Sequence, residues 1–238
     1  MAAVTGASQG LGVAIARQLV EEGASVALLA RSPEKLAAVA AEMGTTALPL
    51  ACDVSDPDSV RRAFDRIAEC WGHLDLLVNN AGIIGMALLE TASDDSIFDQ
   101  VSTNLVGPML CSRAAIPLLR AAGGGDVVNI SSRSVELARP YLSVYSATKG
   151  GLETFSRTLA AELRPDAIRV SAIRVGPVAT EPDLQIERSA KAVTEEWVAR
   201  GGPAPEAPAS AESVADAVVF IATTRRGARI PVLHLEPQ

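Results

Sequence analysis

The feature that most constrains this fold is a regular alternation of short apolar runs with helical stretches. The apolar runs are rich in Val, Leu and Ile and lie at residues 25–30, 46–52, 74–79, 126–131, 169–175 and 230–236. The helical stretches cover residues 11–22, 33–43, 57–71, 94–120, 144–163 and 211–222. Near-continuous apolar strands suit a sheet that is covered on both faces. The alternation therefore predicts an α/β fold, a doubly wound parallel sheet of about seven strands with helices on both faces.

The pattern also bears on domain organisation. No change of composition divides the 238 residues, so we expect a single domain over residues 1–238. Only "MAAV" precedes the first turn, which makes the first strand either unusually short or incomplete. Residues 181–210 interrupt the alternation, and their Gly- and Pro-rich second half predicts irregular chain. Because a helix and a strand follow, we interpret residues 181–205 as a lid over the substrate rather than a linker.

Charge and cysteine usage limit the partners and the compartment. The net charge is −7 and no basic run is present, which disfavours nucleic acid and an anionic membrane surface as partners. The sequence holds no apolar run of membrane-spanning length and no visible signal peptide. Its three cysteines match neither a zinc pattern nor a disulfide framework, and its two histidines have no ligand-spaced companion. We therefore expect a cytoplasmic protein without a metal site.

A glycine-rich turn follows the first strand. In "TGASQGLG", residues 5–12, Gly6, Gly10 and Gly12 lie between a strand and a helix. Glycines permit positive φ and a close approach of backbone to a pyrophosphate, and the N-terminus of the next helix attracts anions. No lysine follows, so the turn is not the phosphate loop of an NTPase. Alone it equally fits a plain strand–helix connection, but its place at the head of a βαβ unit favours a dinucleotide site.

Two scarce residue types occur one helical turn apart. The chain has two tyrosines and three lysines, and "SVYSATKGG" places Tyr145 four residues before Lys149. Residues four apart share a helix face, so a half-exposed tyrosine beside a solvated lysine is the simplest interpretation. The alternative is a proton donor tuned by a cation. Lowering a tyrosine pKa from about 10 to about 7 requires about 4 kcal/mol, and a cation about 4 Å away at an effective dielectric of about 20 supplies that much.

Four further motifs follow in a fixed order. They are "CDV" at 52–54, "NNAG" at 79–82, the asparagine of "STNLVG" at 104, and "NISS" at 129–132. With the glycine turn and the tyrosine–lysine pair, they make the chain resemble the short-chain dehydrogenase/reductase family, in its compact single-domain branch. The resemblance runs from residue 4 to about residue 180. It implies a Rossmann-like fold and a nicotinamide-dependent alcohol dehydrogenase or carbonyl reductase.

The resemblance also implies a role for each matching residue. Tyr145 would be the general acid or base, and Lys149 would lower its pKa and hold the nicotinamide ribose. Ser132 would bind the substrate carbonyl, and Asn104 would hold a water beside Lys149. The implied cofactor-binding residues are Gly6, Ser8, Gln9, Gly10, Leu11, Gly12, Arg31, Ser32, Asp53, Val54, Asn80, Ala81, Gly82, Tyr145, Lys149, Val178 and Thr180. A homodimer or homotetramer is also implied, because the helices at 108–120 and 150–163 carry small and apolar residues that need cover.

Several of these residues have simpler interpretations. Ser132 could cap a strand end, Asn104 could make a backbone contact, and Asp53 could cap the helix that starts near Pro57. One position departs from the family, since Val175 stands where a proline is usual. Two other functions share this fold: an epimerase or dehydratase, whose larger substrate domain this length does not allow, and a cofactor-sensing regulator without turnover. The complete catalytic set favours the enzyme.

The end of the strand at 25–30 concerns the choice of cofactor. A site for NAD(H) has a carboxylate here that accepts hydrogen bonds from the ribose 2′-hydroxyl. This chain has Ala30, then Arg31 and Ser32, and its first acid is Glu34. The planar fork of an arginine suits a 2′-phosphate, and Ser8 and Ser32 add hydroxyl donors. We therefore expect NADP(H) rather than NAD(H), the alternative being that Arg31 is merely solvated.

The substrate is not fixed by the sequence. The segments expected to face it are 133–142 and 177–205. The first of these mixes Arg133, Glu136, Arg139 and Tyr141 with apolar residues, a combination that indicates no particular compound.

Overall fold

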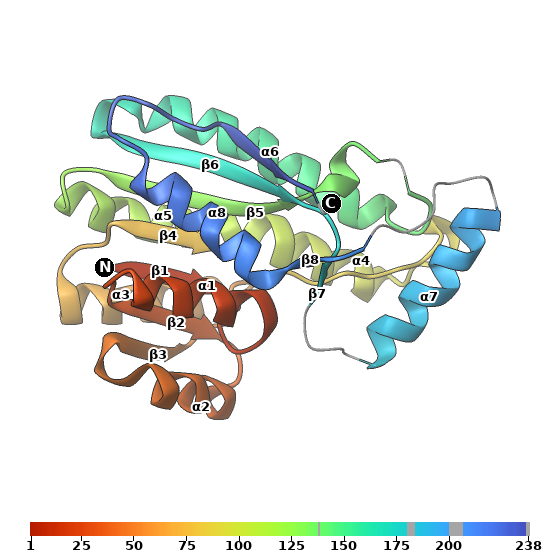
Figure 1. The fold of residues 1–238 in the computed structure, drawn as a ribbon, viewed down its shortest axis with the longest axis horizontal. Helices are drawn as coiled ribbons and strands as arrows, with labels where there is room; N and C mark the ends of the chain where they lie inside the picture. Colours follow the sequence, from red (N-terminus) through yellow and green to blue (C-terminus); the bar gives the residue numbers. More distant parts are fainter. Residues whose placement is uncertain (138, 180–183, 200–206, 237–238) are drawn as a thin grey trace.

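The protein is described by a computed structural model that covers residues 1–137, 139–179, 184–199 and 207–236, with backbone alone for 184–190 and 192. Its centre is a parallel sheet of seven strands in the order β3-β2-β1-β4-β5-β6-β9 (Figure 1). These strands are β1 Ala2–Thr5, β2 Val26–Ala30, β3 Ala47–Ala51, β4 Leu76–Asn79, β5 Gly125–Ser132, β6 Ile168–Val175 and β9 Val232–Leu235. The predicted doubly wound sheet is confirmed.

Helices cover both faces of this sheet (Figure 1). They are α1 Gly10–Glu21, α2 Pro33–Met43, α3 Pro57–Trp71, α4 Asp94–Val101, α5 Gly107–Ala121, α6 Ser143–Glu162, α7 Leu184–Ala199 and α8 Ala211–Thr223. Short 3₁₀ turns lie at Gly44–Thr46, Leu89–Thr91, Arg133–Val135 and Arg164–Asp166. One core joins the sheet to α1, α2 and α8, and the other joins it to α3, α5 and α6. Alternate strand residues such as Leu28 and Leu29 enter opposite cores, which is why the strands are apolar throughout.

Two segments differ from the prediction. The single helix expected over 94–120 is interrupted by a π-helical turn at Ser102–Val106, so α4 and α5 are separate helices. The segment at 181–210 is not simply irregular, since α7 occupies its first half and the two-residue strands β7 Val178–Ala179 and β8 Ala209–Ser210 pair beside it. Residues 200–206, where the glycines and prolines concentrate, lie outside the described part of the chain.

The carboxyl ends of the strands meet along one edge of the sheet. All strands run parallel, but the direction in which successive strands are added to the sheet reverses between β1 and β4. Strands β2 and β3 lie on one side of β1, whereas β5 and β6 lie on the other side, beyond β4. In open parallel sheets, ligands bind in the crevice outside this switch point. Val175, at the position of the expected proline, is the last residue of β6 and lies in register with Ser132 on one side and Leu235 on the other.

In the described part of the chain, no helix is long and apolar enough to cross a membrane.

Candidate active site

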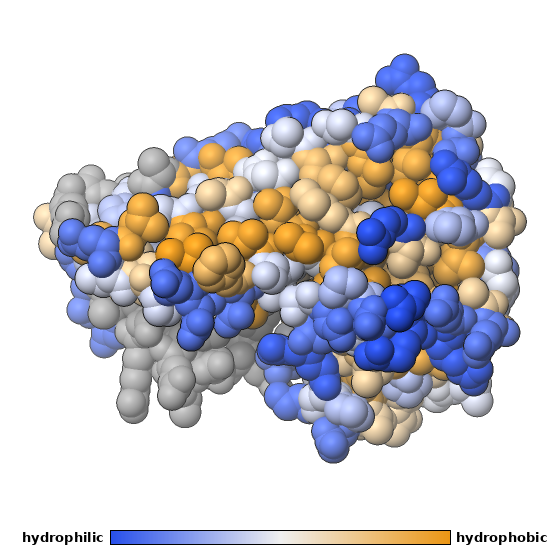
Figure 2. All heavy atoms as spheres, turned by 180° about the vertical axis from the view of Figure 1, so that it is seen from behind, coloured by the Kyte–Doolittle hydropathy of each residue, from blue (hydrophilic) through white to orange (hydrophobic). Residues whose placement is uncertain are grey.

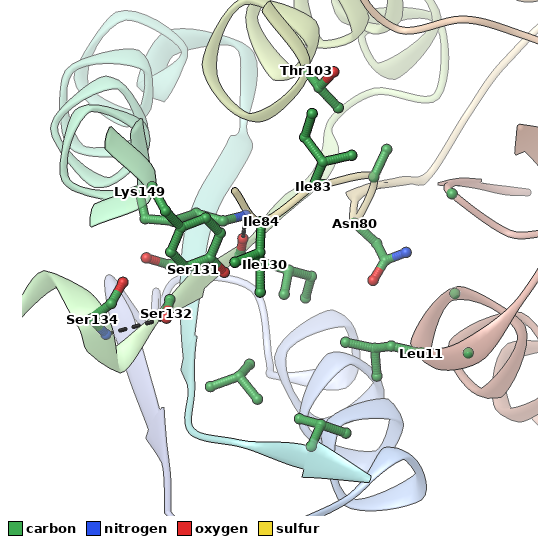
Figure 3. Close-up of a pocket in the computed structure, with 18 of the residues that line it drawn as sticks. Leu11, Asn80, Ile83, Ile84, Thr103, Ile130, Ser131, Ser132, Ser134 and Lys149 are labelled. Carbon is green, nitrogen blue, oxygen red and sulfur yellow. Dashed lines mark hydrogen bonds between the residues drawn. The ribbon is translucent and has the colours of Figure 1, made fainter. Parts of the chain in front are cut away.

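A cavity of about 1120 Å³ lies at this edge of the sheet. Figure 3 shows Ser132, Ser134 and Lys149 at one end of the pocket and Asn80 and Leu11 at the other. The predicted residues that line it are Gly6, Ser8, Gln9, Gly10, Leu11, Gly12, Arg31, Ser32, Asp53, Val54, Asn80, Ala81, Gly82, Ser132, Tyr145, Lys149 and Val178. Asn104 lies outside the lining, and Thr180 lies outside the described residues.

The glycine turn packs closely against the end of β4. A Cβ atom on Gly12 would lie 2.2 Å from the carbonyl oxygen of Gly6, and one on Gly6 would lie 2.9 Å from the Cα of Ala81. Gly6 also has φ +69°, which L side chains rarely adopt. The side chain of Asn80 fixes the same junction, because its Nδ2 donates to the Thr5 carbonyl at 2.9 Å. Only glycines allow the backbone this approach.

The N-terminus of α1 is open toward the cavity. Its N-cap residue, Gln9, makes no side-chain hydrogen bond to the first turn of the helix. The unpaired N–H groups and the helix dipole therefore favour an anion at this end. The Gln9 side chain instead accepts a hydrogen bond from Lys35 Nζ at 2.9 Å, which brings a second cation to the mouth of the cavity near Arg31. Sequence reasoning missed Lys35, although it lies only four residues after Arg31.

Ser32 and Asp53 have local partners as well as cavity positions. Ser32 is the N-cap of α2 and accepts a hydrogen bond from the Lys35 backbone N–H at 3.3 Å. Asp53 accepts from the backbone and hydroxyl of Ser55, at 2.9 and 2.6 Å. It does not cap α3, whose N-cap is Asp56. The capping interpretation of Asp53 is therefore wrong, and its carboxylate helps to shape the wall of the cavity.

Tyr145 and Ser132 meet at the opposite end. Ser132 ends β5 and Tyr145 lies in the first turn of α6, so both face the cavity from neighbouring elements. Burial raises the pKa of the Tyr145 hydroxyl above its ordinary value, and the hydrogen bond with Ser132 opposes this rise without reversing it. Ser132 Oγ also accepts from the Ser134 backbone N–H at 3.1 Å, which fixes its position (Figure 3).

Lys149 is buried beside Tyr145. Its Nζ lies 5.8 Å from the centroid of the Tyr145 ring and donates to the Ile130 carbonyl at 2.8 Å. Burial lowers the pKa of the Lys149 ammonium to about 8. The Tyr145 pKa is therefore raised in the protein alone rather than lowered as expected, because burial of the hydroxyl outweighs its hydrogen bond with Ser132.

Asn104 lies beneath this pair in the π-helical turn. Its amide is fully buried and binds the backbone of Ile83 in both directions, accepting from N–H at 2.8 Å and donating to C=O at 2.8 Å. It also donates to Thr148 Oγ1 at 3.3 Å, one residue before Lys149. These bonds use both polar atoms of the amide, so the side chain joins the segment after β4 to α6. Both N–H donors of the amide are used, but Oδ1 has a second acceptor position, so a water at Asn104 could donate a hydrogen bond there.

A buried ion pair supports the end of β5 from behind. Ser131 Oγ donates to Glu153 Oε1 at 2.7 Å, and Arg174 contacts both oxygens of Glu153 at 2.7 and 2.6 Å. Burial raises the pKa of the Glu153 carboxyl, but the hydrogen bonds from Arg174 and Ser131 outweigh it and leave that pKa lowered. The pair ties β5, α6 and β6 together immediately behind Ser132.

Residues of two segments line the substrate end. Arg133, Ser134, Leu137, Arg139, Pro140 and Leu142 come from the segment after β5, and Val193, Thr194 and Trp197 come from α7. Two of the residues expected here do not line the cavity. Glu136 pairs with Arg174, and the Tyr141 hydroxyl donates to Glu196 of α7. The sequence reasoning also missed Ile83, Ile84, Met86 and Thr103, which carry no polar pattern at a strand end.

A family model for short chain dehydrogenases matches residues 1–191. The chain belongs to this family of oxidoreductases. It is 38% identical over 179 residues to a 3-oxoacyl-[acyl-carrier-protein] reductase of Bos taurus, covering 75% of this chain and 76% of the relative. It is 34% identical over 235 residues to a short-chain type dehydrogenase/reductase of Picea abies, covering 94% of this chain and 85% of that one.

Solved structures of the family share the whole fold. The closed form of a serine dehydrogenase complexed with NADP+ matches with a TM-score of 0.88 and 27% identity, over 99% of this chain and 94% of that chain. A 3-ketoacyl-(acyl-carrier-protein) reductase from Brucella melitensis complexed with NADH matches with a TM-score of 0.86 and 28% identity, over 98% and 95% of the two chains.

Proposed function

We propose that this protein is an NADP(H)-dependent oxidoreductase that interconverts a carbonyl compound and a secondary alcohol. The observation that carries the proposal is the convergence of Tyr145, Ser132 and Lys149 at one end of a cavity whose other end is a glycine turn. The tight packing of Gly6 and Gly12 and the open N-terminus of α1 fit the pyrophosphate of a dinucleotide. When bound, the reduced nicotinamide supplies the hydride that forms the new C–H bond at the carbonyl carbon.

The protein's own residues supply the rest of the chemistry. Ser132 holds the carbonyl oxygen, and Tyr145 donates the proton that forms the O–H bond. In the reverse direction Tyr145 accepts that proton. Lys149 holds its charge next to the tyrosine ring and stabilises the tyrosinate that remains after proton transfer. The buried Ile130 carbonyl and Asn104 keep Lys149 and the start of α6 in place.

The test is the variant Tyr145→Phe, assayed by cofactor absorbance on a panel of carbonyl compounds and alcohols. A general acid contributes about a hundredfold to ten-thousandfold, so kcat should fall by at least about a hundredfold. Cofactor affinity, measured by calorimetry, should survive. Tyr141→Phe is the comparison, because that hydroxyl contacts Glu196 of α7 rather than the cavity, and its loss should lower kcat far less. A Tyr145→Phe enzyme that keeps more than about a tenth of kcat would contradict the role of Tyr145.

The same panel separates the alternatives. A cofactor-sensing regulator would bind the dinucleotide without turning over any compound of the panel. An epimerase or dehydratase would convert its substrate with no net change in cofactor absorbance.

The preference for NADP(H) is supported by the charges around the adenosine end. Arg31 and Lys35 both line the cavity there, and β2 ends in Ala30 with no carboxylate at the position that would bind a ribose 2′-hydroxyl. A charged hydrogen bond of Arg31 to a 2′-phosphate contributes about 1.5–3 kcal/mol, or about ten- to a hundredfold in preference. The kcat/KM ratio for the two cofactors should fall by that factor in Arg31→Ala. A wild type that prefers NAD(H), or a ratio unchanged by the substitution, would overturn the assignment.

We also propose that helix α7 is the substrate lid. Its residues Val193, Thr194 and Trp197 line the cavity, and Tyr141 attaches the helix to the segment before α6. The chain has two tryptophans, so a Trp71→Phe background makes Trp197 the sole tryptophan reporter. Cofactor and substrate together should shift the emission of Trp197 more than cofactor alone. An emission spectrum that neither ligand alters would argue against closure by α7.

We also propose a homodimer or homotetramer that covers α5 and α6, the helices expected at 108–120 and 150–163, together with the neighbouring α4. Figure 2 shows a band of apolar side chains on the side opposite the view of Figure 1. Among the described residues, Phe98 of α4, Val106 of the π-helical turn and Met109 of α5 are exposed apolar side chains. Contiguous apolar surface of this kind marks a protein interface. Light scattering at micromolar concentration should give a mass of two or four chains, and Phe98→Glu should lower it; a monomeric wild type would contradict the proposal.

A further inference from the structure

Two buried polar atoms at the substrate end of the cavity have no partner. Among the described residues, Ser134 Oγ and Arg139 Nε are both buried without a hydrogen bond, and both residues line the cavity. Buried polar groups in folded proteins are nearly always hydrogen-bonded. Two orphaned groups that border the same cavity indicate that a ligand supplies their partners.

The guanidinium of Arg139 also lacks a counter-charge. It forms no ion pair with any residue in the described part of the chain, although two carboxylates belong to neighbouring elements. Glu136 pairs with Arg174, and Glu196 of α7 accepts from Tyr141. Both acids therefore already have partners of their own. A guanidinium presents a planar fork of N–H donors that matches a carboxylate, and Arg139 has this fork available.

The charges around the cavity favour an anion at this end. Arg133, Arg139 and Lys149 line it here, and Asp53 is the only acidic residue of the described lining. Asp53 lies after β3, on the cofactor side, with its carboxylate bound by Ser55. Arg133 Nε lies 3.5 Å from a carboxylate oxygen of Glu236, so of these two arginines Arg139 is the one that has no acid among the described residues.

The position of Ser134 places the anion close to the reacting carbon. The Ser134 backbone N–H donates a hydrogen bond to Ser132 Oγ at 3.1 Å. The unpartnered Ser134 hydroxyl therefore lies close to Ser132, the residue proposed to hold the substrate carbonyl. We infer that the substrate is a short oxo acid or hydroxy acid, whose carboxylate is bound by Arg139 and Ser134 while its carbonyl or hydroxyl faces Ser132 and Tyr145. This inference rests on the proposed function. The carboxylate does not react; it orients the carbonyl for the hydride transfer already described.

The experiment compares two oxo acids with their methyl esters. The probes are 2-oxobutanoate and 3-oxobutanoate, each beside its methyl ester, reduced with NADPH. The wild type should favour at least one acid over its ester by about ten- to a hundredfold in kcat/KM, the contribution of a charged hydrogen bond. Arg139→Gln should abolish this preference and lower kcat/KM for the ester far less than for the acid. Arg139→Lys, which keeps the charge and loses the fork, should retain part of it.

Two further variants sharpen the comparison. Ser134→Ala keeps the backbone N–H that binds Ser132 and removes only the hydroxyl, so it should lower kcat/KM for the acid by about two- to tenfold and spare the ester. Arg61→Gln removes an exposed arginine of α3 outside the cavity and should leave the preference intact. Equal rates for every acid and its ester, or an Arg139→Gln enzyme that loses both alike, would overturn the inference while the proposed function stands.

A binding measurement covers the case in which no compound is reduced. That result would count against the proposed function and leave the anion site to be judged by binding alone. For this the product acids, 2-hydroxybutanoate and 3-hydroxybutanoate, are added to the protein with NADP+. At least one should raise the melting temperature of the wild type and of Arg61→Gln but not that of Arg139→Gln. If neither acid raises the melting temperature of the wild type, or if the wild type and Arg139→Gln respond equally, Arg139 does not bind the carboxylate.

Discussion

The buried ammonium of Lys149 should make the stability of the protein depend on pH. The side chain belongs to a residue that is 4% exposed, and its Nζ donates to the Ile130 carbonyl. Burial lowers its pKa from 10.5 to about 8. A difference of one pKa unit corresponds to about 1.36 kcal/mol, so the charged lysine reduces the free energy of unfolding by about 3 kcal/mol at pH 7.

The sign follows from where the proton is held more tightly. Below pH 8 both the folded and the unfolded chain hold it, and the cost is at its full value. Between pH 8 and pH 10.5 the folded protein has released this proton while the unfolded chain still binds it. Stability rises with pH wherever the unfolded state binds more protons. The cost of Lys149 should therefore shrink by about 2 kcal/mol between pH 7 and about pH 10.

Urea denaturation followed by circular dichroism measures this effect. The comparison is between Tyr145→Phe and Tyr145→Phe/Lys149→Met, because the first substitution removes the coupled titration of the tyrosine. The methionine variant should be the more stable of the two at pH 7, and its advantage should decrease by about 2 kcal/mol by about pH 10. Lys191→Met is the control, since it removes an exposed lysine. A difference that stays constant over this range would show that the Lys149 ammonium is solvated through the cavity and would refute the reasoning.

Three further predictions concern the supports of the site. Gly12→Ala should weaken dinucleotide binding more than tenfold by calorimetry, because its Cβ would lie 2.2 Å from the Gly6 carbonyl oxygen. Glu153→Gln should lower the free energy of unfolding by about 3–5 kcal/mol in urea at pH 7 by breaking a buried pair, whereas Glu153→Leu/Arg174→Met should restore most of it. The pKa of Glu153 is lower in the folded protein than its ordinary value of 4.5, so the stability that the carboxylate contributes is present above pH 4.5 and is lost as the pH falls through the folded-state pKa. The free energies of unfolding of Glu153→Gln and the wild type should therefore converge in acid.

The fold and the outline of the site could be predicted from the sequence because both depend on local order along the chain. Apolar runs and helical stretches fix a parallel sheet, and in such a sheet every strand ends at the same edge. Ser132 is the last residue of its strand, and Asn80 and the glycine turn each follow a strand directly. Their meeting in one cavity is therefore a consequence of the topology rather than of any long-range contact.

Features that depend on distant partners could not be predicted. The helix expected over 94–120 breaks at the π-helical turn, where Asn104 binds the backbone of Ile83, 21 residues earlier in the chain. The residue pattern of 94–120 predicts a helix but gives no sign that Asn104 binds the backbone of Ile83. The glycines of the segment at 181–205, and its prolines after Pro182, follow α7 in the sequence rather than occupy it, so they do not predict this helix.

The direction of the Tyr145 pKa shift also could not be predicted from the sequence, and it bears on the proposed reaction. The four-residue spacing identifies a cation beside the tyrosine, but the spacing does not reveal that both groups are buried. Burial opposes the charged form of each, raising the pKa of Tyr145 and lowering that of Lys149. The protein alone therefore favours a protonated tyrosine, which is the form that donates a proton to a carbonyl. Under the proposed function, reduction can begin directly from this state. Oxidation requires the tyrosinate, and the positive charge of an oxidised nicotinamide bound nearby would stabilise it.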